Sequence, residues 1–193
     1  MKILIIDNGT SYLAQLKKLI DGLVDVISYS EIAEKNDEYF EQFNAIVLSG
    51  GHSFPVTGNE TALQSEIYLI KNIHKPIFGI CYGFELIAHT FGAKLEQLKN
   101  KEHGIIDIEV IQQNDIFQNI LSFKVFESHR WVVQEPLDDL LVLAKSKNGV
   151  EAIKHKTYPI YAVQFHPEMF IDETCGDEIF NNFLNSLKVA SSV

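Results

Sequence analysis

The stretch that decides the fold is Ile77–Ala88, IFGICYGFELIA. Its first four residues form a continuous apolar run of the length of a buried strand, and the residues after Cys81 have the spacing of a helix. Cys81 lies at the junction with a glycine two residues to either side, which is the G-x-nucleophile-x-G pattern of a strand-turn-helix elbow. The stretch therefore predicts a β-α unit with a thiol at its turn.

The chain before this stretch alternates between strand and helix patterns. Short apolar runs predict strands at residues 2–6, 24–27, 45–48 and 77–80. Apolar residues three or four positions apart predict helices around residues 13–20 and 63–70. Strands that alternate with helices indicate a parallel sheet covered on both faces.

From Lys94 onward the pattern changes to consecutive strands and one closing helix. Strands are predicted at residues 104–111, 123–128, 140–145, 149–155 and 160–165, and the helix at residues 179–187. The predicted fold class is therefore α/β, an open and mostly parallel sheet with helices on both faces and a small antiparallel extension. No linker or repeat marks a boundary, so residues 1–193 are predicted to form one domain.

Charge and cysteine content exclude several classes of function. Lysine and arginine number 16 against 26 aspartates and glutamates, and the net charge of -10 disfavours nucleic acid or an anionic membrane as a partner. The apolar run at the amino terminus ends at Asp7, too early for a signal peptide or a spanning helix, which predicts a cytoplasmic protein. Cys81 and Cys175 have neither zinc-site nor disulfide spacing, so no metal site is predicted.

Cys81 is a candidate nucleophile. An elbow would expose its side chain at the carboxyl end of the sheet, where open α/β folds bind ligands. It would also lie at a helix amino terminus, whose dipole is expected to favour the thiolate. The alternative is a small buried apolar residue, since free cysteines are often fully buried.

His166 and Glu168 are the candidate partners of the thiol. His166 follows a predicted strand in YAVQFHPE, and Glu168 lies two residues further on, where its carboxylate could orient the imidazole. The same residues could instead form a turn with a solvated charge. Five further histidines, His52, His74, His89, His103 and His155, are interpreted as surface or packing residues.

Backbone amides after the third strand could stabilise an oxyanion. Gly50 and Gly51 in LSGGHSF allow these amides to turn toward an anion, and the N–H of Gly51 with that of Tyr82 forms the expected oxyanion hole. A phosphate-binding loop is the alternative, but no G-K-[ST] follows and the next lysine is Lys71.

Together these motifs resemble the class I glutamine amidotransferases, which have a flavodoxin-like sheet. The resemblance rests on SGG, GICYG and YAVQFHPE in this order over most of the chain. Within the class, the chain is most similar to the separate glutaminase subunit of archaeal-type GMP synthases. That closer likeness rests on ILIIDNGTSY, on ESH before Arg130, and on EAIKHKTYPIYAVQFHPE followed by GDEIFNNF.

The resemblance implies a reaction and a partner. Cys81 would attack the side-chain amide of L-glutamine, His166 would protonate the departing ammonia and later activate water, and Glu168 would orient His166. The implied intermediate is a γ-glutamyl thioester. Ammonia would pass to an ATP-pyrophosphatase synthetase subunit that activates XMP with ATP and magnesium, whereas this chain itself would bind no cofactor.

The implied substrate site contains departures from the family pattern. The substrate would lie near Gly50, Glu85, His129, Arg130 and Trp131. Glu85 stands where the family usually has glutamine, and a carboxylate cannot donate a hydrogen bond as an amide does. Trp131 stands where an aspartate is common. Position 52, usually proline, is histidine, which would leave the oxyanion loop less rigid.

Three alternative functions remain compatible with the sequence. A free-standing γ-glutamyl amide hydrolase or transferase would use the same three catalytic residues, with Glu85 recognising a different substrate. An amidotransferase subunit could serve another synthase. A non-catalytic interaction module could retain the fold, since fold alone does not establish function.

Overall fold

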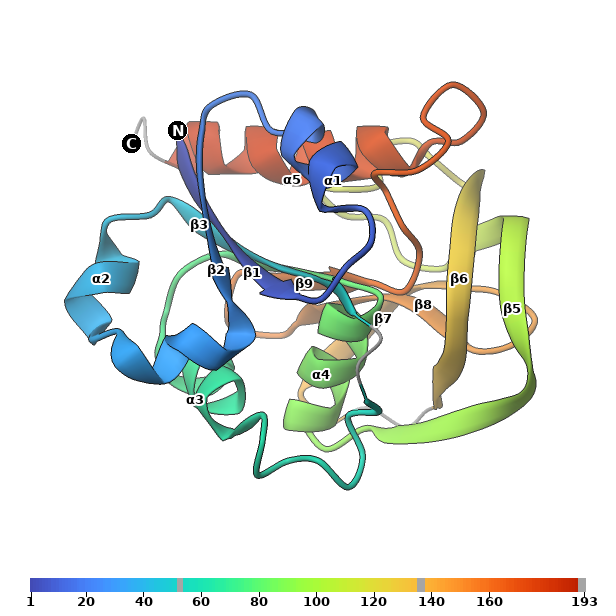
Figure 1. Cartoon of the computed structure of the whole chain (residues 1–193). Coiled ribbons are helices and arrows are strands. Elements are labelled where there is room, and N and C mark those ends of the chain that lie inside the picture. The colour runs from blue at the N-terminus through green and yellow to red at the C-terminus, as the bar shows by residue number, and fades with distance from the viewer. Residues whose placement is uncertain (52–53, 135–137, 191–193) are drawn as a thin grey trace.

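The computed structural model describes residues 1–51, 54–134 and 138–190, and within them the chain forms one mixed nine-stranded sheet with helices on both faces (Figure 1). The strand order is β2-β1-β3-β4-β9-β8-β6-β5-β7. The strands are β1 (Lys2–Asn8), β2 (Leu23–Ser28), β3 (Ala45–Gly51), β4 (Ile77–Ile80), β5 (Lys94–Val110), β6 (Ser122–Gln134), β7 (Leu140–Lys145), β8 (Val150–His155) and β9 (Ile160–Val163). The helices are α1 (Leu13–Leu19), the 3-10 helix η1 (Tyr29–Glu34), α2 (Asp37–Glu41), α3 (Gln64–Asn72), α4 (Tyr82–Thr90) and α5 (Gly176–Ala190).

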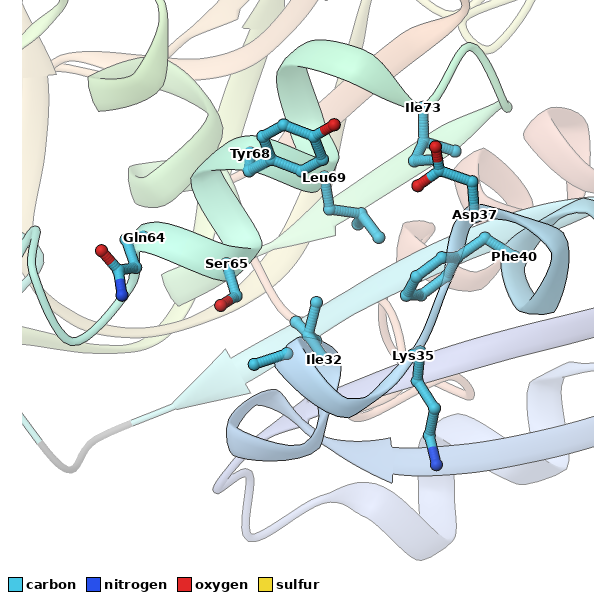
Figure 2. Close-up of a pocket in the computed structure, with 10 residues that line it drawn as sticks. Ile32, Lys35, Asp37, Phe40, Gln64, Ser65, Tyr68, Leu69 and Ile73 are labelled. Atoms are coloured by element: carbon cyan, nitrogen blue, oxygen red, sulfur yellow. The ribbon is translucent and has the colours of Figure 1, made fainter.

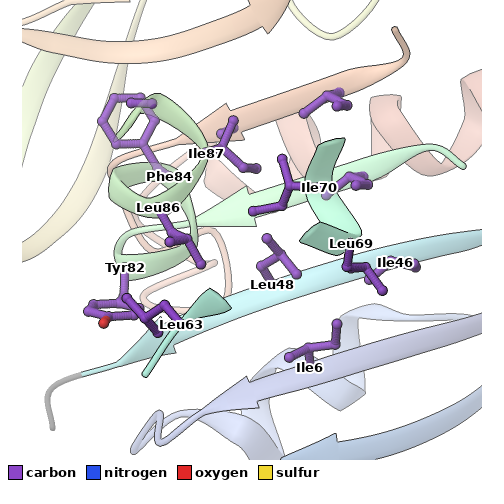
Figure 3. Close-up of a cluster of buried hydrophobic side chains, with 14 of the residues drawn as sticks. Ile6, Ile46, Leu48, Leu63, Leu69, Ile70, Tyr82, Phe84, Leu86 and Ile87 are labelled. Carbon is purple, nitrogen blue, oxygen red and sulfur yellow. The ribbon is translucent and has the colours of Figure 1, made fainter. Parts of the chain in front are cut away.

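The first half of the sheet is parallel. Strands β2, β1, β3, β4 and β9 pair in parallel, and β1, β3, β4 and β9 are mostly buried runs. Alternate side chains of β1 enter two separate cores, as expected from the two-residue period of a strand. Ile3 and Ile5 pack with Leu16 of α1, whereas Leu4 and Ile6 face α3 and α4 (Figure 3). The parallel half is thus covered by α1 and α5 on one face and by α3 and α4 on the other (Figure 1).

The second half of the sheet is antiparallel. Strands β5 and β6 form a long hairpin, β7 pairs with β5, and β8 pairs with β9, β6 and β7. The pairings β8-β6-β5-β7-β8 therefore form a closed ring. Side chains that point into this ring are shielded from water even on strands whose sequences are polar.

The predicted fold class is confirmed, including the parallel core and the antiparallel extension. The predicted strand at residues 77–80 matches β4, and the other predicted elements of the parallel half lie within a few residues of the observed ones. The short helices η1 and α2 and the first half of β5 were not predicted. Residues 94–103 read KLEQLKNKEH, and their charged side chains are mostly exposed, so the segment lacks an apolar strand signal.

In the described ranges, no helix combines the length and the apolar character that crossing a membrane requires. His52, predicted to be a surface or packing residue in the oxyanion loop, lies outside the described residues.

Candidate active site

Cys81 occupies a strained turn between β4 and α4. Its φ is 48° and its ψ is -98°, a backbone conformation that residues other than glycine rarely adopt. Its backbone N–H donates to the carbonyl oxygen of Val163 in β9 at 2.9 Å, which ties the turn to the neighbouring strand. The sequence pattern predicted this elbow, and strain of this kind is concentrated at functional sites.

The two flanking glycines are required by close backbone approaches. A Cβ at Gly83 would lie 2.5 Å from the carbonyl oxygen of Leu48 in β3. A Cβ at Gly79 would lie 2.8 Å from the backbone of Gly83. Because a Cβ essentially never approaches other atoms so closely, α4 can pack against β3 and β4 only with glycine at both positions.

His166 and Glu168 form a buried pair. His166 Nδ1 lies 2.9 Å from Glu168 Oε1, and both side chains are almost fully buried. A carboxylate can only accept, so Nδ1 carries the proton, and in the neutral ring Nε2 is the basic nitrogen. The ring of Tyr12 packs edge-on against His166 with centroids 5.1 Å apart, which further restricts the orientation of the imidazole.

Gly50 brings the histidine and the cysteine together. A Cβ at this position would lie 3.0 Å from Cε1 of His166 and 3.7 Å from Cβ of Cys81. Both side chains therefore approach the same point on β3. The predicted nucleophile and the predicted base, which are far apart in the sequence, are neighbours in the fold.

The loop predicted to supply the oxyanion hole is fixed by a buried polar network. Asn8 Nδ2 donates to the carbonyl oxygen of Ser49 at 3.3 Å and to Glu66 Oε1 at 3.0 Å. A Cβ at Gly51 would collide with the backbone oxygen of Asn8. The backbone N–H of Tyr82 lies near the Cys81 sulfur and lowers the pKa of the thiol. The oxyanion role of Gly51 and Tyr82 stays a prediction, although both residues lie beside the thiol.

A pocket of about 400 Å³ opens at Cys81. It is lined by Gly51, Phe54, Pro55, Cys81, Tyr82, Glu85, Lys101, Ser128, His129, Arg130 and Trp131. The predicted substrate residues Glu85, His129, Arg130 and Trp131 thus surround the nucleophile, with the first on α4 and the others on β6. Arg130 is exposed at the rim, Trp131 is half-buried, and His129 is buried in the wall.

The predicted stabilisation of the thiolate by the helix amino terminus is wrong for the free chain. Burial of Cys81 raises the pKa of its thiol well above the ordinary value, and the charges of Glu85, Glu127 and Glu168 raise it further. The hydrogen bond from the backbone of Tyr82 acts in the opposite direction but is the smallest contribution. Desolvation and three nearby carboxyl groups therefore oppose ionisation of the thiol in the free chain.

Gln164 connects Glu85 to the thiol, and the sequence pattern did not single it out. Its Nε2 lies 3.4 Å from Glu85 Oε1 and 3.9 Å from Cys81 Sγ, and its side chain is fully buried. Burial raises the pKa of Glu85 to about 7, although His129 and the Gln164 hydrogen bond lower it. The available sequence signal was the position of Gln164, directly after β9 and two residues before His166.

A second pocket of similar size, about 390 Å³, lies between η1, α2 and α3 (Figure 2). Its lining combines Ile32, Phe40, Leu69 and Ile73 with polar groups such as Lys35, and it includes neither a cysteine nor a histidine. Size therefore does not distinguish the two pockets. The strained thiol and the oriented imidazole assign the chemistry to the pocket at Cys81.

Comparison with known proteins connects this arrangement to one family. The family model described as "Glutamine amidotransferase class-I" matches residues 4–187. A subunit of the glutamine-hydrolyzing GMP synthase of Thermococcus kodakarensis is 36% identical over an alignment of 191 positions. The alignment covers 94% of this chain and 96% of that protein.

Two further relatives extend the comparison. The glutamine-hydrolyzing GMP synthase of Petrotoga mobilis is 33% identical over 96% of this chain, but the match covers only 36% of that longer protein. The crystal structure of a Thermoplasma acidophilum protein, provisionally described as a GMP synthase subunit, superposes with a TM-score of 0.86 and 29% identity. That superposition covers 100% of this chain and 96% of the other.

Proposed function

The chain belongs to the class I glutamine amidotransferases, and from this we propose that it hydrolyses L-glutamine to glutamate and ammonia for a synthetase subunit that aminates XMP to GMP. The observation that carries the proposal is the strained Cys81 elbow beside the buried His166–Glu168 pair. Few arrangements other than a nucleophile with its base explain why a positive φ is maintained at a cysteine.

Cys81 and His166 carry out the proposed chemistry in two steps. The Cys81 sulfur bonds to the γ-amide carbon of glutamine as His166 takes the thiol proton, and His166 then gives that proton to the nitrogen as the C–N bond breaks and ammonia leaves. His166 next removes a proton from water, whose oxygen attacks the γ-glutamyl thioester. The C–S bond breaks, glutamate is released and the thiol is restored.

Glu168 supports these steps through its contact with His166. Its Oε1 holds the Nδ1 proton, which fixes the tautomer in which Nε2 is available for proton transfer. It also stabilises the imidazolium that forms during each proton transfer. Because the pKa of Cys81 is raised in the free chain, the base has to act during the attack, so the orientation of His166 is essential.

Glu85 is proposed to bind the glutamine amide in its protonated form. Its pKa of about 7 means that an appreciable fraction carries a proton near neutral pH. A protonated carboxyl offers one O–H donor and one C=O acceptor, the same pair of functions as a primary amide. This accounts for a glutamate at a position where glutamine is usual, and it predicts that substrate affinity falls at higher pH.

The partner is proposed from the relatives and their sizes. The relatives of this chain's length are named as single subunits of a glutamine-hydrolyzing GMP synthase, and the Petrotoga relative carries the matching segment within a much longer protein. We therefore place the activation of XMP, with its ATP and magnesium, on a separate ATP-pyrophosphatase subunit in a heteromeric complex. This chain would supply only ammonia and would bind no cofactor for that reaction.

The cytoplasm is the proposed compartment. The mechanism needs Cys81 as a free thiol, and thiols are kept reduced there.

The test is ammonia release from glutamine by the purified chain, alone and with an XMP-activating subunit, ATP, magnesium and XMP. We expect release that requires Cys81, is lost in Cys81→Ala, and rises when the partner mixture is added. Release that ignores the partner would favour a free-standing glutaminase. Cleavage of other γ-glutamyl amides but not of glutamine would favour the altered substrate that Glu85 makes possible.

A further inference from the structure

A second buried cluster of polar side chains lies behind the wall of the active-site pocket. Glu102 of β5, Glu127 and His129 of β6, and Glu151 of β8 meet inside the antiparallel ring. Glu127, His129 and Glu151 are buried, and the proposed mechanism gives no role to the carboxyl groups of this cluster. Three carboxyl groups around one imidazole in a desolvated site are neutralised either by protons, which burial of Glu127 and Glu151 favours by raising the pKa of both groups, or by a bound cation.

The imidazole of His129 is oriented as a ligand would be. Its Nδ1 lies 2.8 Å from the carbonyl oxygen of Trp131, and because a carbonyl can only accept, Nδ1 carries a proton. The Nε2 atom then faces Glu127 Oε2 at 3.2 Å and Glu102 Oε2 at 3.6 Å. A backbone carbonyl that holds the far nitrogen is the usual support of a metal-binding histidine.

The carboxylates of the cluster lack donors. Glu127 and Glu151 lie within hydrogen-bond reach of each other, but a bond between two carboxyl groups needs a shared proton. When both groups are ionised, both oxygens of Glu127 and Oε2 of Glu151 are buried without a donor, and Nε2 of His129 is also without a hydrogen-bond partner. Glu151 Oε1 accepts from Ser146 Oγ at 2.6 Å, and Glu102 Oε2 accepts from Asn148 Nδ2 at 2.7 Å. An uncompensated buried carboxylate costs several kcal/mol, on the order of the total stability of a domain.

We propose that Glu102, Glu127, His129 and Glu151 bind one divalent transition-metal cation, with Zn²⁺ as the best match. One imidazole with several carboxylates suits zinc better than magnesium or calcium, which prefer ligand sets made only of oxygen. Donor atoms of Glu102, His129 and Glu151 already lie within 4.8 Å of one another.

The spacing around His129 is close to that of a tetrahedral site. Bonds of about 2.0–2.2 Å to zinc place neighbouring donor atoms roughly 3.4 Å apart. The contacts of Nε2 with Glu127 and Glu102, at 3.2 and 3.6 Å, match this value. The donor atoms of Glu102, His129 and Glu151 are at most 4.8 Å apart, so binding requires the carboxylates to draw in by no more than about 1.4 Å relative to tetrahedral spacing, which a change of side-chain rotamer can supply.

A cation at this position would also act on the nucleophile. His129 lines the pocket that contains Cys81, and Glu127 is one of the carboxyl groups whose charge opposes ionisation of the thiol. A positive charge behind the wall would favour the thiolate through space, without a metal contact to the substrate. The binding itself does not depend on the proposed glutaminase activity.

The test is zinc binding by the metal-stripped full-length chain, measured by calorimetry and by elemental analysis after dialysis. We expect one zinc per chain in the wild type. His129→Asn removes Nε2 but can still donate to the Trp131 carbonyl, and we expect it to weaken binding by at least about 100-fold. Glu151→Gln keeps the acceptor for Ser146 and should also weaken binding.

Two control variants exclude other zinc ligands. Cys81→Ser removes the catalytic thiol. His103→Gln removes an exposed histidine of the β5–β6 hairpin; His103 pairs with Ser128, the residue before His129. Both should bind one zinc like the wild type. The inference is overturned if the wild type binds no stoichiometric zinc, if Cys81→Ser abolishes binding, or if His129→Asn and Glu151→Gln both retain it.

Cobalt spectroscopy keeps the test decisive if the buried variants fail to fold. The wild-type chain loaded with Co²⁺ should show d–d absorption without a thiolate-to-metal charge-transfer band, because the proposed ligands are nitrogen and oxygen only. A charge-transfer band would place the metal on a cysteine and overturn the inference. Circular dichroism of each variant reports whether it is folded.

Discussion

Replacing Glu85 with glutamine should make Cys81 more reactive above neutral pH. The substitution keeps the size of the side chain and an oxygen that can accept from Gln164, but it removes a buried group that ionises with a pKa of about 7. That charge is one of those that raise the pKa of the Cys81 thiol. Its removal should therefore lower the pKa of the thiol.

The size of the effect follows from the shared contact with Gln164. Glu85 Oε1 and Cys81 Sγ lie 3.4 and 3.9 Å from the same Nε2 atom. The two charges are therefore no more than about 7 Å apart, and at an effective dielectric constant near 20 their repulsion is about 2.4 kcal/mol, or roughly 1.7 pKa units. The thiolate fraction would rise about 50-fold, and the lower intrinsic nucleophilicity of a more acidic thiol reduces the net gain in rate to about 5- to 10-fold.

The assay is alkylation of Cys81 by iodoacetamide, followed by mass spectrometry, with Cys175 as an internal reference. At pH 8 Glu85→Gln should react about 5- to 10-fold faster than the wild type. At pH 6, where Glu85 is mostly protonated in the wild type, the two rates should converge. Glu38→Gln, a change at an exposed position on α2, is the control and should leave the rate unchanged at both pH values.

Two results would refute this reasoning. Equal rates for the wild type and Glu85→Gln at pH 8 would mean that Glu85 does not oppose ionisation of the thiol. An equal acceleration at pH 6 and pH 8 would mean that the substitution changes access to Cys81 rather than its charge environment.

Three further predictions concern the positioning of the base, a buried carboxyl and the glycine of the elbow. Glu168→Gln should lower kcat by roughly 10²- to 10⁴-fold with a smaller effect on KM, because it permits the wrong tautomer of His166; an unchanged kcat would remove Glu168 from the mechanism. Burial raises the pKa of Glu66 from 4.5 to about 7. Between these pH values the folded chain therefore binds more protons than the unfolded chain. The free energy of unfolding is then highest below pH 4.5 and falls by about 3 kcal/mol as the pH rises through 7. Urea unfolding across this range should show a smaller decrease in Glu66→Gln, and equal slopes would contradict the assignment. Gly83→Ala should reduce the free energy of unfolding by about 1–3 kcal/mol, because its Cβ would press on the Leu48 carbonyl; an unchanged urea midpoint would contradict the close approach.

The elbow was predictable because its signal is local. The strand, the thiol, the helix and both glycines lie within Ile77–Ala88, and the structure maintains the strained turn with the close approaches that only glycine permits. The pairing of His166 with Glu168 was predictable for the same reason, since the two residues are separated by one position after a strand. Their assigned catalytic roles stay predictions that the experiments above test.

The electrostatic environment of the thiol could not be predicted from the sequence. Glu85 is close to Cys81 in the chain, but Glu127 approaches Cys81 through the pairing of distant strands, and Gln164 joins the group from the residue directly after β9. A local pattern shows the helix dipole that favours a thiolate, whereas desolvation depends on the whole fold. For this reason the direction of the pKa shift at Cys81 was predicted incorrectly.

The acidic cluster escaped sequence reasoning because its members are spread over three strands. Glu102 lies in a polar segment that was not predicted to be a strand, and Glu151 reads as one of several polar residues of the strand VEAIKH. Their convergence follows from the closed ring of pairings among β5, β6, β7 and β8. The strand register and the closure of the ring depend on residues that are far apart in the sequence. A rule based on the sequence spacing of metal ligands would therefore not have detected the cluster.

The most direct test of the central claim is capture of the acyl-enzyme. The wild-type chain is mixed with glutamine, quenched in acid during turnover and digested, and its cysteine peptides are examined by mass spectrometry. The proposed mechanism predicts a γ-glutamyl group on the peptide that contains Cys81, no such group on the Cys175 peptide, and no adduct in Cys81→Ala. Ammonia release without an adduct on Cys81, or with the adduct on Cys175, would contradict it.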